Sequence, residues 1–139
     1  MTGRDFLGLA KDLLNSDYES ALRTSVSRSY YAIFHHVKTI FVSSRIRLKN
    51  EAQDHGTMAH YLESSDLPEA RYIGQKLKDL RAERNDADYD LAKTKFNKNT
   101  CTLQYLLAKS LCDKIDSLDQ TKLKTSLVHY AERKGDLFP

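Results

Sequence analysis

The chain has 139 residues, of which 40% are hydrophobic, a size that suits one domain with a single core and is too small for two. Its 22 basic and 19 acidic side chains leave a formal charge of +3, which permits contact with nucleic acid but does not predict it. The sequence has neither an apolar run long enough to span a membrane nor a recognisable export signal, so we expect a cytoplasmic protein that makes no membrane contact.

The chain contains few residues that interrupt helices, with only five glycines and two prolines, which favours an all-helical fold. Apolar residues over Phe6–Leu14 predict a short first helix. Ser16 and Glu19 have the spacing of a capping box and predict the start of a second helix. This helix is expected to be long, because apolar residues recur every three or four positions over Leu22–Phe41.

Periodicity lapses after the second helix. Residues 45–67 include Gly56 and many polar side chains, so they are predicted to form the main loop, in which residues 58–62 are compatible with a short helix. Pro68 then predicts the start of a third long helix, since proline fits the first helical turn, where its missing amide hydrogen is not needed. This helix is expected to end near Leu91.

The last third of the chain predicts a polar connection and two more helices. Residues 93–99 hold three lysines and two asparagines without periodicity. Apolar spacing predicts a fourth helix over Leu103–Leu118 and a weaker fifth helix over Leu123–Tyr130. One apolar stripe per helix favours packing as an antiparallel bundle of four to five helices, in one domain over residues 1–139.

The two cysteines, Cys101 and Cys112, are eleven positions apart on what is expected to be one helix. At about 1.5 Å per residue they would be roughly 16 Å apart, too far for a disulfide. We therefore expect free thiols, as in a reducing cytosol.

A charged residue falls within the apolar stripe of the third long helix. Apolar residues recur on this face at Ile73, Leu77, Leu80, Ala87 and Leu91. Their spacing places Arg84 on the same face. Because a buried arginine needs a partner, we expect Arg84 to be paired, to lie at a subunit interface or to line a functional cleft.

Two segments carry a family resemblance: Ser27–His35 (SRSYYAIFH) and Arg81–Tyr89 (RAERNDADY). Both are similar to motifs of the HEPN superfamily, and with the helix order the resemblance covers most of residues 5–130. It implies a helical bundle that forms a homodimer through its two long helices. Many members are metal-independent RNA endonucleases of prokaryotic toxin-antitoxin or phage-defence systems, often encoded beside a nucleotidyltransferase antitoxin.

The nuclease motif of that family is an arginine followed, after a short spacing, by a histidine, and two copies meet across the dimer. Here Arg84 and Asn85 match its start, but Tyr89 stands where a histidine would be expected, and no histidine occurs over Arg71–Val128. An ending in alanine, aspartate and tyrosine resembles one branch of the family. Attack by the 2′-hydroxyl of RNA needs a proton acceptor near neutral pH, which suits histidine better than tyrosine or arginine. Two functions therefore stay open, an endoribonuclease and a non-catalytic module that binds nucleotide, RNA or a partner protein.

The resemblance and the helical spacing assign candidate site residues. The candidate catalytic residues are Arg84, Asn85, Asp88, Tyr89 and His35, and the candidate substrate-binding residues are Arg81, Arg28 and Tyr31. Arg84 would hold phosphate, Asn85 and Asp88 would orient it, and His35 would supply the missing base if it faces Arg84.

These residues also have a structural interpretation. Arg84 and Asp88 would form an ion pair that fixes helix packing, and Tyr89 would fill the edge of the core. His35 would be a hydrogen-bonded residue beside its apolar stripe. A third hypothesis makes Tyr89 a modification target, since some toxins of the family are silenced by adenylylation of a tyrosine near the motif.

The remaining histidines and basic residues predict no site. His55 and His60 lack the spacing or the cysteine neighbours of a zinc site, so neither a metal nor a cofactor is expected. Two basic clusters are more typical of solvated surface than of phosphate contacts: Arg45, Arg47 and Lys49, and Lys93, Lys95 and Lys98.

Overall fold

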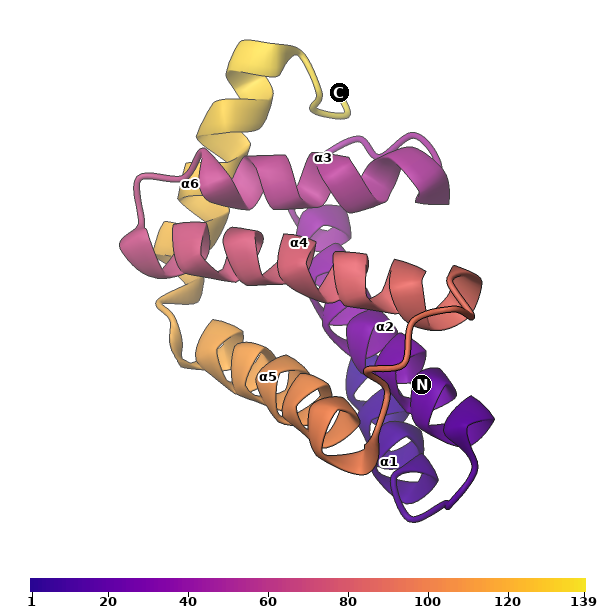
Figure 1. Ribbon diagram of the computed structural model, residues 1–139. Helices are drawn as coiled ribbons and strands as arrows, with labels where there is room; N and C mark the ends of the chain where they lie inside the picture. The colour runs from indigo at the N-terminus through magenta and orange to yellow at the C-terminus, as the bar shows by residue number, and fades with distance from the viewer.

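A computed structural model describes residues 1–139 as six α-helices without a strand, which confirms the predicted all-α class (Figure 1). The helices are α1 (Gly3–Leu13), α2 (Glu19–Ser43), α3 (Glu51–Glu63), α4 (Pro68–Tyr89), α5 (Lys98–Ser117) and α6 (Gln120–Lys134). One isolated β-bridge joins Ile46 to Leu137. None of the helices is both long enough and apolar enough to cross a membrane.

The two long helices that carry the motif segments, α2 and α4, pack against each other and cross (Figure 1). α1 lies along α2, and α3 lies along α4, so each long helix belongs to a pair of consecutive helices. α5 packs against α2, and α6 contacts α3. Residues far apart in the sequence are therefore brought together where α4 crosses α2.

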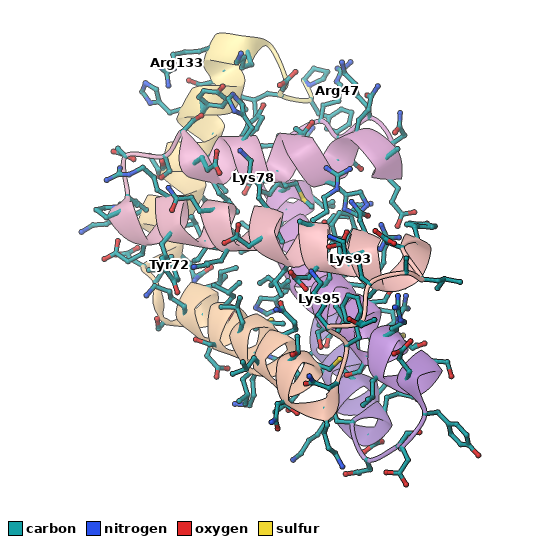
Figure 2. The ribbon with its side chains drawn as sticks, in the orientation of Figure 1. Arg47, Tyr72, Lys78, Lys93, Lys95 and Arg133 are labelled. Atoms are coloured by element: carbon teal, nitrogen blue, oxygen red, sulfur yellow. The ribbon has the colours of Figure 1, made fainter.

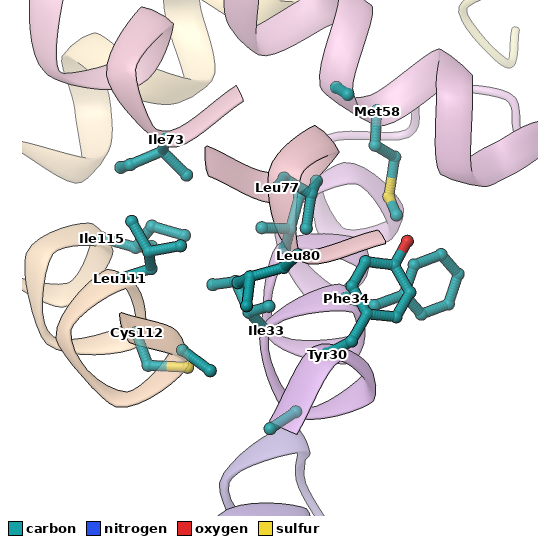
Figure 3. Packing of buried hydrophobic residues seen from close by; sticks show 14 of the residues in the cluster. Tyr30, Ile33, Phe34, Met58, Ile73, Leu77, Leu80, Leu111, Cys112 and Ile115 are labelled. Carbon is teal, nitrogen blue, oxygen red and sulfur yellow. The ribbon is translucent and has the colours of Figure 1, made fainter. Parts of the chain in front are cut away.

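Apolar side chains of α4 fill the space between α2, α3 and α5. Leu77 and Leu80 are almost completely buried, and Figure 3 shows them facing Ile33 of α2, Ile115 of α5 and Met58 of α3. Burial of such a side chain contributes about 1.5–3 kcal/mol. The buried apolar residues form one continuous cluster, which holds the crossing of α2 and α4 in place.

Glycines allow close approach within both helix pairs. A Cβ atom on Gly74 of α4 would lie 2.9 Å from the carbonyl oxygen of Ala59 and from the amide nitrogen of Glu63, both in α3. A Cβ atom on Gly3 of α1 would meet the backbone of Ala32 and lie 2.8 Å from the amide nitrogen of His36, both in α2. Larger residues at either position would force the paired helices apart.

The prediction that residues 45–67 form the main loop is wrong, because most of this segment is α3, a helix of 13 residues. Only its part near residues 58–62 has the apolar spacing of a helix. The helix also turns polar side chains inward: Asp54 accepts a hydrogen bond from the amide of Lys49 at 3.0 Å, and the His55 ring bonds to the hydroxyl of Tyr30. Buried polar residues of this kind hide a helix from hydrophobic periodicity.

Three other features of the predicted helices differ from the structure. The chain has six helices and not four to five, because α3 was not counted. The predicted capping box is also absent: Tyr18 is the N-cap of α2, and the Ser16 hydroxyl accepts a hydrogen bond from the Tyr18 amide at 3.1 Å. The third predicted helix, now α4, ends at Tyr89, and Leu91 lies beyond it with 77% of its surface exposed.

Candidate functional site

The two motif segments meet at an open pocket of about 300 Å³, which we call the Arg84 pocket. It is lined by Ser27, Arg28, Tyr31, His35, Glu51, Arg84 and Asp88. Five of the eight residues predicted from the sequence are in this set: Arg28, Tyr31, His35, Arg84 and Asp88. The pocket lies where α2, α3 and α4 converge.

Arg84 is the best connected residue of the pocket, with a side chain that is 15% exposed. Its Nη2 donates a hydrogen bond to the Tyr31 hydroxyl at 2.8 Å, and its Nη1 donates to Oδ1 of Asn85 at 3.0 Å. Its Nε lies 3.0 Å from Oδ2 of Asp88, an ion-pair contact, although the N–H is not directed at that oxygen. Arg84 is therefore paired within its own chain, as its place in an apolar stripe requires.

Polar contacts continue from Asp88 to the other arginine of the pocket. Asp88 accepts a hydrogen bond from the Ser27 hydroxyl at 3.2 Å, and Nη2 of Arg28 donates to the same hydroxyl at 3.3 Å. The Arg28 guanidinium lies 5.2 Å from the ring centre of Phe6 and 5.1 Å from that of Tyr31. Arg28 makes cation–π contacts and no ion pair, so its charge is available to an anion.

His35 is held by stacking. Its ring lies 5.5 Å from the Phe6 ring at an interplanar angle of 19°, and no hydrogen bond to the imidazole is present, so the predicted hydrogen-bonded role of His35 is wrong. Burial lowers the pKa of His35, with a further contribution from the charge of Lys38, which favours the neutral ring at pH 7. A neutral imidazole is able to accept a proton.

Tyr31 stands next to both His35 and Arg84. Its ring centre is 5.9 Å from that of His35 and 5.0 Å from the Arg84 guanidinium carbon. Burial raises the pKa of Tyr31, and the charge of Arg84 opposes this shift without reversing it. His35 and Arg84 thus share the pocket without a hydrogen bond between them, and Tyr31 is the side chain that contacts both.

The other three predicted residues do not line the pocket. Tyr89 is 73% exposed, so the prediction that it fills the core edge is wrong; its ring centre is 5.6 Å from the Arg84 guanidinium. Asn85 is exposed and bonds to Arg84. Arg81 faces Gly56 of α3, and its buried Nε has no hydrogen-bond partner.

Sequence reasoning missed Arg23, which fixes the end of the motif helix. Arg23 of α2 is 5% exposed and donates hydrogen bonds to backbone carbonyls at and beyond the end of α4: those of Asp86, Ala87, Asp90, Leu91 and Lys93. Its Nε also donates to Glu19 at 3.2 Å. A signal was available, because Arg23 precedes Val26 and Tyr30 on the apolar face of α2 by three and seven residues.

The sequence also did not predict that Glu51 and His55 of α3 lie at or near the Arg84 pocket. Glu51 lines the Arg84 pocket and makes no ion pair. His55 is 6% exposed and packs on Phe34, with ring centres 4.4 Å apart. Burial lowers the pKa of His55, helped by the charges of Arg81 and Arg84. No signal marked these residues, because their segment lacks helical periodicity.

The basic clusters are largely engaged at the surface. Figure 2 shows Lys93 and Lys95 beside the C-terminal half of α4. Both pair with Asp86, at 3.1 and 3.0 Å, and Lys95 also pairs with Glu83 at 2.9 Å. The Arg47 guanidinium lies over the Phe138 ring at 5.0 Å. Lys93 and Lys95 therefore stabilise the C-terminal half of α4 through ion pairs.

No group of three or more histidine, cysteine, aspartate or glutamate side chains is placed to hold a metal ion. Cys101 and Cys112 are free, as predicted, and both are buried. Burial raises the pKa of Cys101 to about 11 and that of Cys112 to about 12, so neither thiol is suited to nucleophilic chemistry near neutral pH.

Comparisons of the chain with protein-family models, curated proteins and solved structures found no match. Functional interpretation therefore rests on the two motif segments and on the pocket that they form.

Proposed function

We propose that this chain is a HEPN-type RNA-targeting protein of a prokaryotic toxin-antitoxin or phage-defence system, and that it acts as a homodimeric, metal-independent endoribonuclease in the cytoplasm. The observation that carries the proposal is the hydrogen bond of 2.8 Å from Arg84 to the Tyr31 hydroxyl, which joins two motif segments 53 positions apart in the sequence. An arginine, a neutral histidine and a protonated tyrosine then face one open pocket.

Each of these groups would have a separate role when the 2′-hydroxyl attacks the neighbouring phosphodiester of RNA. His35 would accept the proton of the 2′-hydroxyl as its oxygen attacks phosphorus. Arg84 and Arg28 would stabilise the charge that develops on the phosphoryl oxygens. Tyr31 would give its proton to the departing 5′-oxygen, a far stronger base than the phenolate left behind. The products would be a 2′,3′-cyclic phosphate and a 5′-hydroxyl.

The surface beside the pocket supports a second copy as partner. Tyr89, which directly follows the pocket residue Asp88, is 73% exposed, and Leu91, two residues further on, is 77% exposed. Large exposed side chains next to a polar pocket suit a subunit contact. Their exposure also suits recognition by a nucleotidyltransferase antitoxin.

A non-catalytic interaction module is the second candidate, favoured by the partners that Arg84 already has. Tyr31, Asn85 and Asp88 all contact its guanidinium. Asp88 and Glu51 also place two carboxylates at the pocket, which oppose binding of a phosphate. Under this alternative the pocket would bind nucleotide, RNA or a partner protein without cleaving RNA.

Incubation of the purified protein with total RNA in the presence of a chelator tests the proposal. We expect cleavage by the wild type and a loss of about 100-fold or more in Arg84→Ala, the scale reported for removal of one transition-state donor. Lys78→Ala is the control, since Lys78 is an exposed residue of the same helix that pairs with Glu63 (Figure 2). Absence of cleavage, or equal cleavage by Arg84→Ala, refutes the catalytic proposal.

Two measurements in cells separate the candidates further. Expression without an antitoxin should arrest growth if the chain is a nuclease, and should be tolerated if it is an interaction module. If Tyr89 is a modification target, coexpression with a neighbouring nucleotidyltransferase should increase the intact mass of the wild type but not that of Tyr89→Phe. An unchanged wild-type mass removes the modification hypothesis.

A further inference from the structure

The Arg84 pocket is one part of a longer groove along α2. A second pocket of about 610 Å³ shares His35 with it. A third, of about 340 Å³, shares Lys38 and Val42 with the second pocket and Glu51 with the Arg84 pocket. The three pockets share wall residues and therefore adjoin one another along α2, and we call them together the α2 groove.

The floor of the α2 groove is a single face of one helix. Its α2 residues are Ser27, Arg28, Tyr31, His35, Lys38, Thr39, Val42 and Ser43. Most are spaced by three or four positions, so they form one stripe. From Arg28 to Val42 the stripe extends roughly 21 Å at about 1.5 Å per residue, a length that several stacked nucleotides of about 3.4 Å each would occupy.

The second pocket is lined by both apolar and polar side chains. Phe6 and His35, which stack on each other, line it together with Val42, which is 61% exposed. Thr39 and Lys38 also line it. An apolar surface of aromatic and aliphatic side chains with a few polar groups is suited to a planar heterocycle.

Cations alternate with rings along the groove. The Arg28 guanidinium lies 5.2 Å from the ring centre of Phe6 and 5.1 Å from that of Tyr31. Lys38 lines the second pocket, on the same face of α2. Arg84 stacks on Tyr31 from the α4 side. Rings that stack on bases, alternating with charges that meet phosphates, are the pattern by which proteins bind single-stranded nucleic acid.

We propose that the α2 groove binds single-stranded RNA, with a phosphate held by Arg84 and Arg28 and an adjacent unpaired base in the pocket of Phe6, His35 and Val42. This inference rests on the proposed function and names the form of RNA that the site accepts. His35 belongs to both pockets, so one nucleotide that places its phosphate at Arg84 has its neighbour's base beside the His35 ring. Bases of a duplex are paired and stacked inside, so they cannot enter the pocket.

The carboxylates along the groove differ in how strongly they oppose a phosphate. Asp54 is buried and bonds to the Lys49 amide, with Lys38 at 3.7 Å. Asp88 is paired with Arg84. Glu51 is the groove carboxylate that makes no ion pair, at the junction of the Arg84 pocket and the third pocket. Glu51 is therefore the carboxylate that most opposes a phosphate held by Arg28 and Arg84.

Fluorescence anisotropy with a labelled short single-stranded RNA tests the base pocket. Val42→Glu and Phe6→Leu should each weaken binding about tenfold, within the range known for the loss of one base–aromatic contact. Leu103→Glu is the matched control, because it makes the same kind of change at an apolar residue of α5 that is 65% exposed and outside the groove. Thermal unfolding of each variant checks that it remains folded.

An abasic RNA of the same length and a duplex of the same sequence complete the experiment. Both RNAs should bind the wild type more weakly than the single strand does. Val42→Glu should bind the abasic RNA with the same affinity as the wild type. If single-stranded RNA binds and Arg84→Ala weakens it, while Val42→Glu and Phe6→Leu bind as well as Leu103→Glu, the base pocket is refuted and the proposed function stands. If the wild type binds no RNA, both the base pocket and the proposed function are refuted. Equal affinity for duplex and single strand also overturns the inference.

Discussion

Arg23 is predicted to hold the motif helix in the position that forms the Arg84 pocket. Arg23→Ala removes a guanidinium that donates to backbone carbonyls at the end of α4, of which the closest is that of Lys93 at 2.6 Å. The bond to the Ala87 carbonyl, at 3.1 Å, is fully buried, and the others are partly reached by solvent. Water is therefore able to replace some of these donors but not all of them.

The size of the effect follows from the two strongest contacts. A hydrogen bond from a charged donor contributes about 1.5–3 kcal/mol, so loss of those to Lys93 and Ala87 should cost about 3–6 kcal/mol of the free energy of unfolding. Loss of the packing of Arg23 on the Phe96 ring, 4.7 Å away, acts in the same direction. For a domain of this size the Tm should fall by roughly 10 °C or more.

Urea unfolding followed by circular dichroism measures this free energy. Arg71→Ala is the control, because Arg71 is exposed and its guanidinium donates to a single backbone carbonyl, that of Ser65, at 3.0 Å. We expect it to cost about 1 kcal/mol or less. Hydrogen exchange should in addition increase at the amides of residues 86–93 in Arg23→Ala. Equal stability of the two variants, with unchanged exchange over residues 86–93, would show that Arg23 does not anchor the helix end.

Three other predictions concern protonation, thiol reactivity and charge. Burial lowers the pKa of His35 and His55, so the unfolded chain binds more protons than the folded chain below the ordinary histidine pKa of about 6.5. The free energy of unfolding should therefore be retained above that pH and decrease as pH falls below it; urea titrations at pH 7.5 and 5.5 with equal results would contradict this. Cys101 and Cys112, whose pKa values burial raises to about 11 and 12, should react slowly with a thiol reagent at pH 8 and rapidly in urea, whereas rapid reaction of the folded protein would show that they are accessible. Glu51→Gln should tighten binding of single-stranded RNA roughly two- to fivefold, since it removes a carboxylate that makes no ion pair from the groove, and Glu69→Gln in the first turn of α4 should not; weaker binding by Glu51→Gln would count against the groove.

Helices whose inward face is apolar were predictable from spacing alone. Leu77 and Leu80 of α4 repeat at the helical period, and Pro68 marks its start, so its bounds were found within two residues. In α3, by contrast, Asp54 and His55 are buried beside Met58. Their burial depends on Lys49 and Tyr30, partners that become visible only once α2 and α3 are packed together.

The pairing of Arg84 with Asp88 was predictable from the sequence, but the contacts of these two residues with α2 were not. A charge on an apolar stripe needs a partner, and Asp88 lies one turn further along the same helix. Tyr31 and Ser27 lie on α2, and only the crossing of the two helices brings them to Arg84 and Asp88. The outward position of Tyr89 likewise depends on where α4 ends.

The product ends of RNA cleavage test the central claim most directly. Wild-type protein, incubated with single-stranded RNA and a chelator, is predicted to leave 2′,3′-cyclic phosphate and 5′-hydroxyl ends, because the 2′-hydroxyl attacks while His35 accepts its proton and Arg84 stabilises the phosphoryl oxygens. Arg84→Ala and His35→Ala should lose these products, while Lys78→Ala retains them. Intact RNA with the wild type, or the same ends at the same rate from Arg84→Ala, would contradict the claim that the Arg84 pocket cleaves RNA.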